Sequence, residues 1–513
     1  MKKTVLLIAL SLTIVFTGCG QEQLSSVETT PKSLVDVIQQ GESGLFSVPF
    51  DSYRGDTKDL PIGVFDSGIG GLTVLAEILQ LDSFDNRTHE PGPDGIPDFE
   101  NERFIYLGDQ ANMPYGNYPS EDKVDFLREL ILKDAIFLLG QRYWLSGSAK
   151  APRTDKPPVK AIVIACNTAT AYGLEDIRSA LERWNLPVYL VGVVEAGARG
   201  AVQALGKRDS SGAGTVAVMA TVGTCKSEGY VRAVEKSSRE AGIDTPDVVQ
   251  QGSLGLAGAI EGDPSFIAPQ ETKPRAGYKG PAADNKNAVI DKDIIDKYGF
   301  DMSGIIGDRN APETWQLNSV GNYVRYDTTS LVENYRRSGS GEPITTVILG
   351  CTHFPYQVES IEASFDRLRH YSADDGTQPY KNLIAEDIIF IDPAQLTAEQ
   401  LYLALAESHI LLRPGETTAI SVDEFFISVP NVSFGETQLA EGGGFTYEYK
   451  YGRNPGRFDV EYVKRVPMSN KNLSAEVMNS IRETMPVIYE RLVLFNAESP
   501  RCSGLQKSET IMK

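Results

Sequence analysis

Two cysteine motifs carry the residue types that proton-transfer chemistry needs. Cys166-Asn167-Thr168 follows the apolar run VKAIVIA, and Cys351-Thr352-His353 follows the apolar run TTVIL and a glycine. A thiol at the N-terminus of a helix has a lowered pKa and can act as a base near neutral pH. The hydroxyl and amide groups beside it can donate hydrogen bonds to a carboxylate. Two such thiols on opposite faces of one carbon could remove a proton from one face and return one to the other, which inverts the centre.

A disulfide bond between Cys166 and Cys351 is the competing interpretation, since it suits a protein that enters an oxidising compartment. It leaves the polar residues after each cysteine without a purpose. We expect Cys225, in the stretch ATVGTC, to lie in the core, and Cys502 to be a free thiol in a polar tail. Only one of the four histidines belongs to a motif; those for which we expect no chemical role are His89, His370 and His409.

The elements around these motifs alternate between short apolar strands and amphipathic helices, which is the pattern of an α/β protein. A strand at 62–65 leads into the glycine-rich turn 66–71 and a helix at 72–81. Further strands are expected at 104–107, 159–165, 188–194, 215–219 and 345–349, and further helices at 124–139 and from Ser227. Ligands of such folds bind beyond the carboxyl ends of the strands, where both cysteines would lie. The similarity of VIACNTA to VILGCTHF predicts two similar α/β halves.

Several stretches read as insertions or extensions. Residues 84–101 and 262–343 are mostly polar, and Asp94 to Asp98 resembles one arm of a calcium-binding loop, for which a solvated loop is the alternative. The alternation at 445–451 predicts a half-buried strand, and Ser474 is expected to cap a helix that Pro486 kinks.

Composition excludes several classes of protein. The 513 residues include 49 basic and 69 acidic residues, a net charge of −20, which argues against nucleic-acid binding. Five cysteines are too few for a disulfide scaffold in a chain of this length. The length suits about three domains, or two large domains with insertions.

The N-terminus reads as an export signal. Lys2 and Lys3 precede an apolar run at 5–16, and Phe16-Thr17-Gly18-Cys19 resembles a bacterial lipobox. Cys19 would then be lipidated, and the polar stretch that follows would be a tether to the membrane. The alternatives are a plain secretory peptide or a misassigned start, and the protein is expected in the cytoplasm if the signal is not used.

Four motifs together resemble the bacterial glutamate racemases. They are IGVFDSGIGGLTV at 62–74, MPYG at 113–116, ACNTA at 165–169 and LGCTHFP at 349–355, in the order of the family. The resemblance covers about residues 61–412. It implies two pseudo-symmetric α/β domains with mainly parallel sheets, an active site in the cleft between them, and neither cofactor nor metal.

The resemblance and the termini together predict the domain organisation. We expect a lipoprotein signal peptide at 1–18, a tether at 19–60 and a tail at 501–513. One racemase domain would comprise 61–191 and 371–500, and the other 192–370 with an insertion near 262–343. The resemblance leaves open a homodimer.

The resemblance also implies roles for individual residues. Cys166 would deprotonate D-glutamate with help from Asp66, and Cys351 would deprotonate L-glutamate with help from His353 and Glu261. D-glutamate made in this way supplies the peptidoglycan of the cell wall. The expected substrate-binding residues are Asp66, Ser67, Tyr115, Gly116, Asn167, Thr168, Thr352 and His353.

The chain departs from the family pattern at three places. Gln110 and Asn112 stand where Thr and Arg usually precede the Pro-Tyr-Gly motif, and the usual Cys-Pro is absent near Ser253. Export is also unusual for a family that acts inside the cell. An aspartate racemase, and a non-catalytic, surface-displayed amino-acid-binding lipoprotein, therefore remain alternatives.

Overall fold

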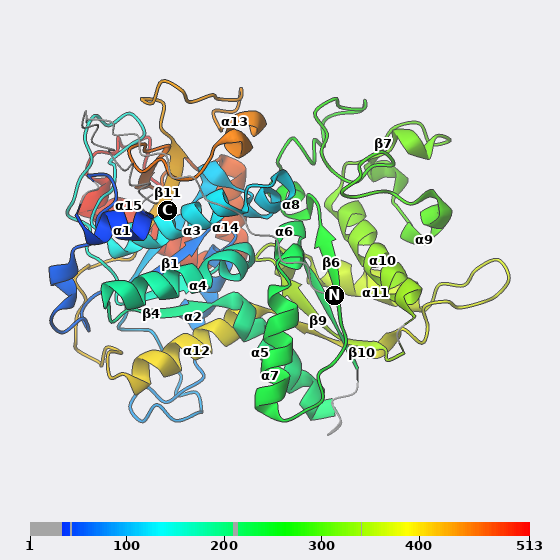
Figure 1. Cartoon of the computed structure of the whole chain (residues 1–513), viewed down its shortest axis with the longest axis horizontal. Coiled ribbons are helices and arrows are strands. Elements are labelled where there is room, and N and C mark those ends of the chain that lie inside the picture. Colours follow the sequence, from blue (N-terminus) through cyan, green and yellow to red (C-terminus); the bar gives the residue numbers. More distant parts are fainter. Residues whose placement is uncertain (1–32, 42–43, 209–213, 340, 513) are drawn as a thin grey trace, which may run out of the picture.

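The computed structural model describes residues 33–41, 44–208, 214–339 and 341–512. Two sheets flanked by helices lie side by side, the six-stranded one built from the first and last parts of the chain and the four-stranded one from the middle (Figure 1). The predicted signal peptide, Cys19 and the first part of the predicted tether lie outside the described residues.

The larger domain is built on a sheet with strand order β12-β11-β2-β1-β3-β4. All neighbours are parallel except β12, which runs antiparallel to β11. Because β1, β2 and β3 are parallel and buried, they read in sequence as continuous apolar runs. The strands are β1 Ile62–Asp66, β2 Phe104–Gly108, β3 Ala161–Ile164, β4 Tyr189–Gly192, β11 Glu424–Pro430 and β12 Val463–Pro467.

Helices cover both faces of this sheet, and each face has its own apolar core. The helices against one face are α1 Leu34–Gln39, α3 Val124–Leu139 and α4 Asn167–Trp184. Those against the other face are α2 Leu72–Gln80, α12 Pro393–Glu407, α14 Ala475–Thr484 and α15 Pro486–Glu498. Ser474 caps α14, as predicted, whereas Pro486 begins the separate helix α15 and does not kink a continuous one.

The smaller domain has a parallel sheet with strand order β10-β9-β5-β6, again covered on both faces. Its strands are β5 Thr215–Thr221, β6 Val248–Ser253, β9 Ile344–Gly350 and β10 Ile384–Ile391. Its main helices are α5 Val193–Arg208, α7 Gly229–Ala241, α10 Val320–Ser338 and α11 Val358–Arg369. The expected α/β class and the two mainly parallel sheets are confirmed.

Two predicted boundaries of the smaller domain are wrong. The chain does not return to the larger domain at 371, because β10 pairs with β9 and completes the smaller sheet. The insertion predicted near 262–343 is shorter, because α10 packs its buried face against the core of that sheet. What remains before α10 is irregular, with α9 Ile295–Tyr298 and a hairpin of β7 Ile305–Ile306 and β8 Gln316–Leu317.

The predicted tether and tail are packed wherever the structure describes them. From Ser33 onward the tether segment contains α1 and buries Leu34, Phe46 and Tyr53 in the core of the larger domain. At the other end, Cys502 is a free thiol, as predicted, but it is buried in the core of the larger domain and does not lie in an unpacked polar tail. Both predictions fail because widely spaced apolar residues in a polar stretch can still anchor a segment to an existing core.

The strand predicted at 445–451 is also wrong. The chain forms the helix α13 Tyr447–Gly452, whose N-cap Thr446 accepts a hydrogen bond from the amide of Tyr449. The rings of Tyr447 and Tyr451 lie 4.6 Å apart on one side of this helix. Aromatic residues at every second position therefore serve a helix here, since the i, i+4 pair packs as well as a strand face would.

The acidic loop near Asp94 is held by its own turns. The carboxylates of Asp82, Asp94 and Asp98 accept hydrogen bonds from backbone amides of the same loop. Within the described ranges, no group of three or more His, Cys, Asp or Glu side chains could hold a metal ion. None of the helices in these ranges is long and apolar enough to cross a membrane.

Candidate active site

The glycine-rich turn after β1 supplies the first residues of the site. Asp66 Oδ2 accepts hydrogen bonds from the amides of Gly68, at 3.0 Å, and Gly71, at 3.1 Å. Asp66 Oδ1 is buried and has no hydrogen-bond partner among the described residues. Burial raises the pKa of Asp66, although the nearby His353 acts in the opposite direction. The turn thus presents a buried oxygen that can accept a hydrogen bond from a ligand.

Gly70 brings the two domains together at this turn. A Cβ at Gly70 would lie 2.6 Å from Thr352 Oγ1 and 2.7 Å from His353 Cε1, both in the smaller domain. The absence of a side chain therefore lets the turn of one domain rest on the cysteine motif of the other. The glycine-rich turn and the Cys351 motif consequently meet at the interface between the domains.

Cys166 is placed by β3 and by the helix that follows. It is the N-cap of α4, and its sulfur accepts a hydrogen bond from the amide of Ala169 at 3.4 Å. The thiol donates a hydrogen bond to Ser67 Oγ, 3.7 Å away. Burial raises the pKa of Cys166, and the Asp66 carboxylate raises it further. The helix terminus does not overcome these effects, so Cys166 holds its proton at neutral pH, contrary to the lowered pKa that the sequence suggests.

Cys351 lies at the end of β9 and begins a hydrogen-bonded chain. Its sulfur is 3.5 Å from His353 Nδ1, and His353 Nε2 is 2.6 Å from Glu261 Oε1. Burial alone would lower the pKa of His353, but its hydrogen bonds with Cys351 and Glu261 raise it well above 6.5. The imidazole is therefore a cation that lies between the Cys351 sulfur and the Glu261 carboxylate.

Three threonine hydroxyls converge from both domains beside these motifs. Thr168 Oγ1 lies 3.0 Å from Thr221 Oγ1 and 3.0 Å from Thr224 Oγ1, and the last two are also 3.0 Å apart. Thr168 was expected from the sequence, whereas Thr221 and Thr224 were not. Their signal was the strand–turn ATVGT, which places two hydroxyls at the carboxyl end of β5.

Asn167 is oriented by a residue that the sequence did not reveal. The hydroxyl of Tyr230, on α7, donates a hydrogen bond to Asn167 Oδ1 at 2.5 Å. Both side chains are buried. Because the amide oxygen faces Tyr230, the amide nitrogen faces away from it and remains a donor for a ligand.

The hydroxyl of Tyr115 points into the larger domain, between two buried carboxyl groups. It lies 2.6 Å from a carboxylate oxygen of Asp109 and 2.6 Å from one of Asp134, inside the larger domain. Burial raises the pKa of Asp134, and the neighbouring Asp109 raises it further, so that the Asp134 carboxyl can supply the proton that this arrangement needs. The Tyr115 hydroxyl is thus held by carboxylates of its own domain, and a role of Tyr115 in substrate binding stays a prediction. Gly116 does reach the interface, where a Cβ would lie 2.7 Å from Thr221.

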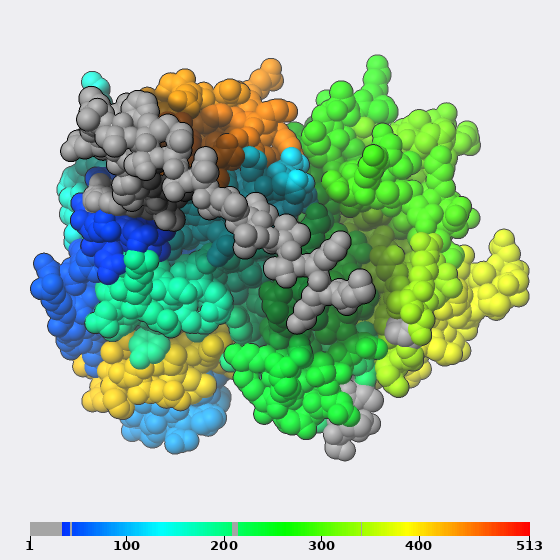
Figure 2. All heavy atoms as spheres, in the orientation of Figure 1, coloured from blue at the N-terminus to red at the C-terminus, as the bar shows by residue number. Residues whose placement is uncertain are grey.

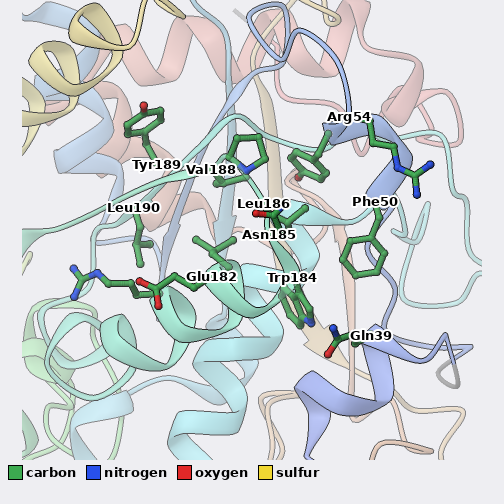
Figure 3. Close-up of a pocket in the computed structure, with 14 residues that line it drawn as sticks. Gln39, Phe50, Arg54, Glu182, Trp184, Asn185, Leu186, Val188, Tyr189 and Leu190 are labelled. Atoms are coloured by element: carbon green, nitrogen blue, oxygen red, sulfur yellow. The ribbon is translucent and has the colours of Figure 1, made fainter.

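Both sulfurs are covered and unpaired. Cys166 and Cys351 are each 6% exposed, and neither forms a disulfide, so the disulfide interpretation is wrong for this structure. Above the interface, a notch separates the surface around α13 from that of residues 262–319 (Figure 2). A cavity of 1030 Å³ lies elsewhere, against β4 and the end of α4, and none of the predicted site residues lines it (Figure 3).

The arrangement combines two cysteines in different surroundings with groups suited to an amino acid. Hydroxyl and amide donors at Asn167, Thr168 and Thr352 can bind carboxylates, and Asp66 can bind an ammonium group. The predicted catalytic residues Cys166, Cys351, Asp66, His353 and Glu261 all lie at this one interface.

Comparison with known proteins agrees with the motifs. A glutamate racemase of Enterococcus faecalis is 40% identical over 177 residues, which are 34% of this chain and 47% of that protein. A glutamate racemase of Lysinibacillus sphaericus is 27% identical over 385 residues, which are 74% of this chain and 95% of that protein. The chain is thus similar to curated glutamate racemases, at 40% identity over about a third of its length and at 27% identity over about three quarters of it.

The extent of the similarity differs between relatives. The chain spans about half the length of the first curated glutamate racemases it matches, those of Enterococcus faecalis and, at 32% identity, Caldanaerobacter subterraneus. No family model matches the chain. A crystal structure of a Bacillus anthracis glutamate racemase has a TM-score of 0.40 at 23% identity, covering 72% of this chain and 89% of that one. One from Francisella tularensis, in complex with D-glutamate, has a TM-score of 0.39 at 20% identity, covering 77% and 95%.

Proposed function

We propose that this protein interconverts L-glutamate and D-glutamate by moving a proton at the α-carbon between two cysteines. The observation that supports this most directly is that the glycine-rich turn, whose Ser67 lies beside Cys166, rests on the Cys351 motif through Gly70. The named activity of the curated relatives supports glutamate as the substrate.

The reaction requires one thiolate and one thiol. In the L-to-D direction, the Cys351 thiolate takes the α-proton, and the electron pair of the broken C–H bond remains on the substrate. The Cys166 thiol then donates its proton to the opposite face of the carbon. The product leaves Cys351 as a thiol and Cys166 as a thiolate, which is the state that converts D-glutamate back.

The surroundings of the sulfurs suit this starting state. Burial and Asp66 raise the pKa of Cys166, which keeps it protonated as the acid. The His353 cation, held by Glu261, lies 3.5 Å from the sulfur of Cys351, which acts as the base in this direction of the proposed reaction.

The polar groups at the interface match the three charges of glutamate. The hydroxyls of Thr168, Thr221 and Thr224 and the amide of Asn167 offer donors for the two carboxylates. The unpartnered Oδ1 of Asp66 offers an acceptor for the ammonium group. Since both cysteine residues are only 6% exposed, we expect the domains to move apart when the substrate enters.

The location of the enzyme is part of the proposal. The Lys2-Lys3 segment, the apolar run and the sequence Phe16-Thr17-Gly18-Cys19 support export and a lipid anchor at Cys19. D-glutamate formed there would supply peptidoglycan, and a homodimer is compatible with the fold. Replacing Cys19 with alanine is expected to move the protein from the membrane fraction to the soluble fraction; an unchanged distribution contradicts the anchor.

Chiral chromatography of reduced, signal-free protein tests the activity. L-glutamate is expected to reach an equal mixture of enantiomers, and L-aspartate under the same conditions is expected to remain unchanged. Conversion of aspartate alone would make the protein an aspartate racemase. Binding of glutamate by calorimetry without conversion would make it an amino-acid-binding protein.

A further inference from the structure

The side chain of Gln110 crosses the interface between the domains. It contacts Glu261 of the smaller domain, which is hydrogen-bonded to His353. Gln110 begins the short 3-10 helix Gln110–Asn112, directly after β2 of the larger domain. Its Nε2 donates a hydrogen bond to Glu261 Oε2 at 3.3 Å. Glu261 is the C-cap of α8 Leu256–Ile260 in the smaller domain, and its side chain is 10% exposed. The contact can exist only while the two domains are together.

The two oxygens of Glu261 divide their partners between the domains. Oε2 faces Gln110, whereas Oε1 is 2.6 Å from His353 Nε2. His353 in turn reaches the sulfur of Cys351 through Nδ1. The Gln110 amide is therefore the outer end of a hydrogen-bonded chain that ends on a thiol.

We propose that Gln110 is a positioning residue that couples closure of the two domains to the protonation state of the Cys351 site. When the domains meet, its amide holds the Glu261 carboxylate in place and in its charged form. Glu261 then keeps His353 as the cation beside Cys351. This role rests on the proposed racemisation and adds to it the step that prepares the base on closure.

Local packing does not explain the orientation of this side chain. Gln110 Oε1 is buried and has no hydrogen-bond partner in the described parts of the chain. The other contact of Nε2 is the sulfur of Met113, at 3.6 Å, which is a weak acceptor. The bond to Glu261 is thus the strong interaction of the side-chain amide, and a bond to an ionised carboxylate is stronger than one between neutral groups.

Other titratable groups surround Glu261 and His353. Asp66 approaches from the end of β1, Tyr106 from β2, Cys351 from the end of β9 and Tyr356 from the turn after it. Asp66 is an acid on the larger domain, so it also becomes a neighbour of His353 on closure. Asp66 therefore also influences the charge of His353 in the closed form. The test leaves Asp66 unchanged, so any difference between the variants comes from Gln110.

Two substitutions at Gln110 separate its donor from its volume. Gln110→Ala removes the donor, so the Glu261 carboxylate is less stabilised and the acidic limb of the kcat profile is expected to move up by about half a pH unit. Gln110→Glu sets a second carboxylate against Glu261, and the two then share a proton; we expect the limb to move up by about one pH unit. Gln316→Ala is the matched control, because Gln316 is a half-buried glutamine whose amide bonds with Arg275 in the insertion.

A double-mutant cycle shows whether Gln110 acts through Glu261. On the acidic limb, Gln110→Ala is expected to lower kcat about threefold in the wild type and to leave it nearly unchanged in the Glu261→Gln background. Equal fold-changes in the two backgrounds would overturn the proposal, as would wild-type pH profiles of both Gln110 variants.

The titration of His353 provides a readout that does not need activity. The chain has four histidines, so the ¹⁵N resonances of His353 can be assigned by substitution. Gln110→Glu is expected to move the His353 titration to higher pH in the closed, ligand-free protein, while Gln316→Ala leaves it unchanged. An unmoved His353 titration contradicts the coupling even if the protein is a racemase. A moved titration in a protein without racemase activity retains the coupling and rejects the proposed function.

Discussion

The sulfurs of Cys166 and Cys351 have different electrostatic surroundings. Cys166 faces a serine hydroxyl and an aspartate, and burial raises its pKa. Cys351 faces a histidine cation whose charge is balanced by Glu261. A reversible reaction needs such a difference to reverse on each turnover, because the thiol that begins as the acid ends as the base. In the proposed reaction, each sulfur is an acid in one direction and a base in the other. Asp66 assists Cys166 in this exchange, and the Glu261–His353 pair assists Cys351.

Tyr230→Phe tests the orientation of Asn167. Loss of the hydroxyl removes the 2.5 Å hydrogen bond and frees the amide to rotate, which costs about 1 kcal/mol. We expect the KM for glutamate to rise about fivefold to tenfold with a smaller change in kcat, measured by steady-state kinetics. The control is Tyr489→Phe, whose hydroxyl also makes one hydrogen bond, to the carbonyl of Met512, far from the thiols. An unchanged KM in Tyr230→Phe would contradict the role of Tyr230.

At the residue scale, the motifs identified site residues that directly follow a strand. They did not identify residues whose partners lie far away in the sequence. Cys166, Cys351 and Asp66 each follow a strand and could be found from the sequence. Thr221 and Tyr230 could not be found in this way, because their partners Thr168 and Asn167 are more than fifty residues away in the chain. The place of Tyr115 could not be predicted either, since it depends on buried carboxylates from α3 and the end of β2.

At the scale of elements, the glycine-rich turn is the piece that couples the two sheets. It leaves β1 of one domain and rests against the end of β9 in the other. The apolar runs predicted both strands, since parallel strands buried on both faces lack polar positions. The helix α13 could not be predicted from alternation alone, because its tyrosines pack at i, i+4.

Gly70→Ala tests this coupling. The added Cβ would lie 2.6 Å from Thr352 Oγ1 and 2.7 Å from His353 Cε1, so it opposes closure without a clash inside its own domain. We expect kcat/KM to fall at least about tenfold while the melting temperature changes by only a few degrees. Gly206→Ala on α5 is the control, because nothing lies within 4 Å of the Cβ it adds. Full activity of Gly70→Ala would show that the turn and the second motif do not meet in the active form.

Asp327 on α10 makes the stability of the smaller domain depend on pH. Burial raises the pKa of Asp327 to about 7, although hydrogen bonds from Ser253 and Gln251 act in the opposite direction. Because the folded state favours the protonated acid, the stabilisation is present below about pH 4 and is lost as the pH rises to 7. Asp327→Asn is therefore expected to raise the free energy of unfolding at pH 8 by about 3 kcal/mol, and by little at pH 4.

Denaturant unfolding at the two pH values measures this difference. Asp374→Asn, at an exposed acid of a surface loop, is the control and is expected to change neither value. A loss of stability in Asp327→Asn at pH 8 would mean that the buried carboxylate is charged and needed in the fold.

At the scale of the whole molecule, two α/β domains close on one buried site. The sequence predicted this plan because the strand–cysteine–turn element occurs twice. It misplaced the boundary at 371, since no local feature tells which sheet β10 joins. It also assigned residues 33–60 to a tether, although this segment is part of the core of the larger domain.

Phe46→Ala tests the place of this segment in the fold. Phe46 is 6% exposed and packs in the core of the larger domain, where Lys133 Nζ lies 4.9 Å from its ring centre. Truncation is expected to lower the free energy of unfolding by about 3 kcal/mol, whereas a residue of a free tether would give no change. Val432→Ala, at a residue that is 60% exposed, is the control. If Phe46→Ala and the wild type were equally stable, this segment would be a tether and not part of the core.

Deuterium incorporation in the first few per cent of conversion tests the two-thiol account most directly. Reduced protein is incubated with L-glutamate in D₂O, and the enantiomers are separated before mass spectrometry. Two thiols on opposite faces predict deuterium at the α-carbon of D-glutamate and protium in the recovered L-glutamate, with both conversion and label lost in Cys166→Ser and in Cys351→Ser. Equal label in both enantiomers, or conversion that survives either substitution, would contradict it.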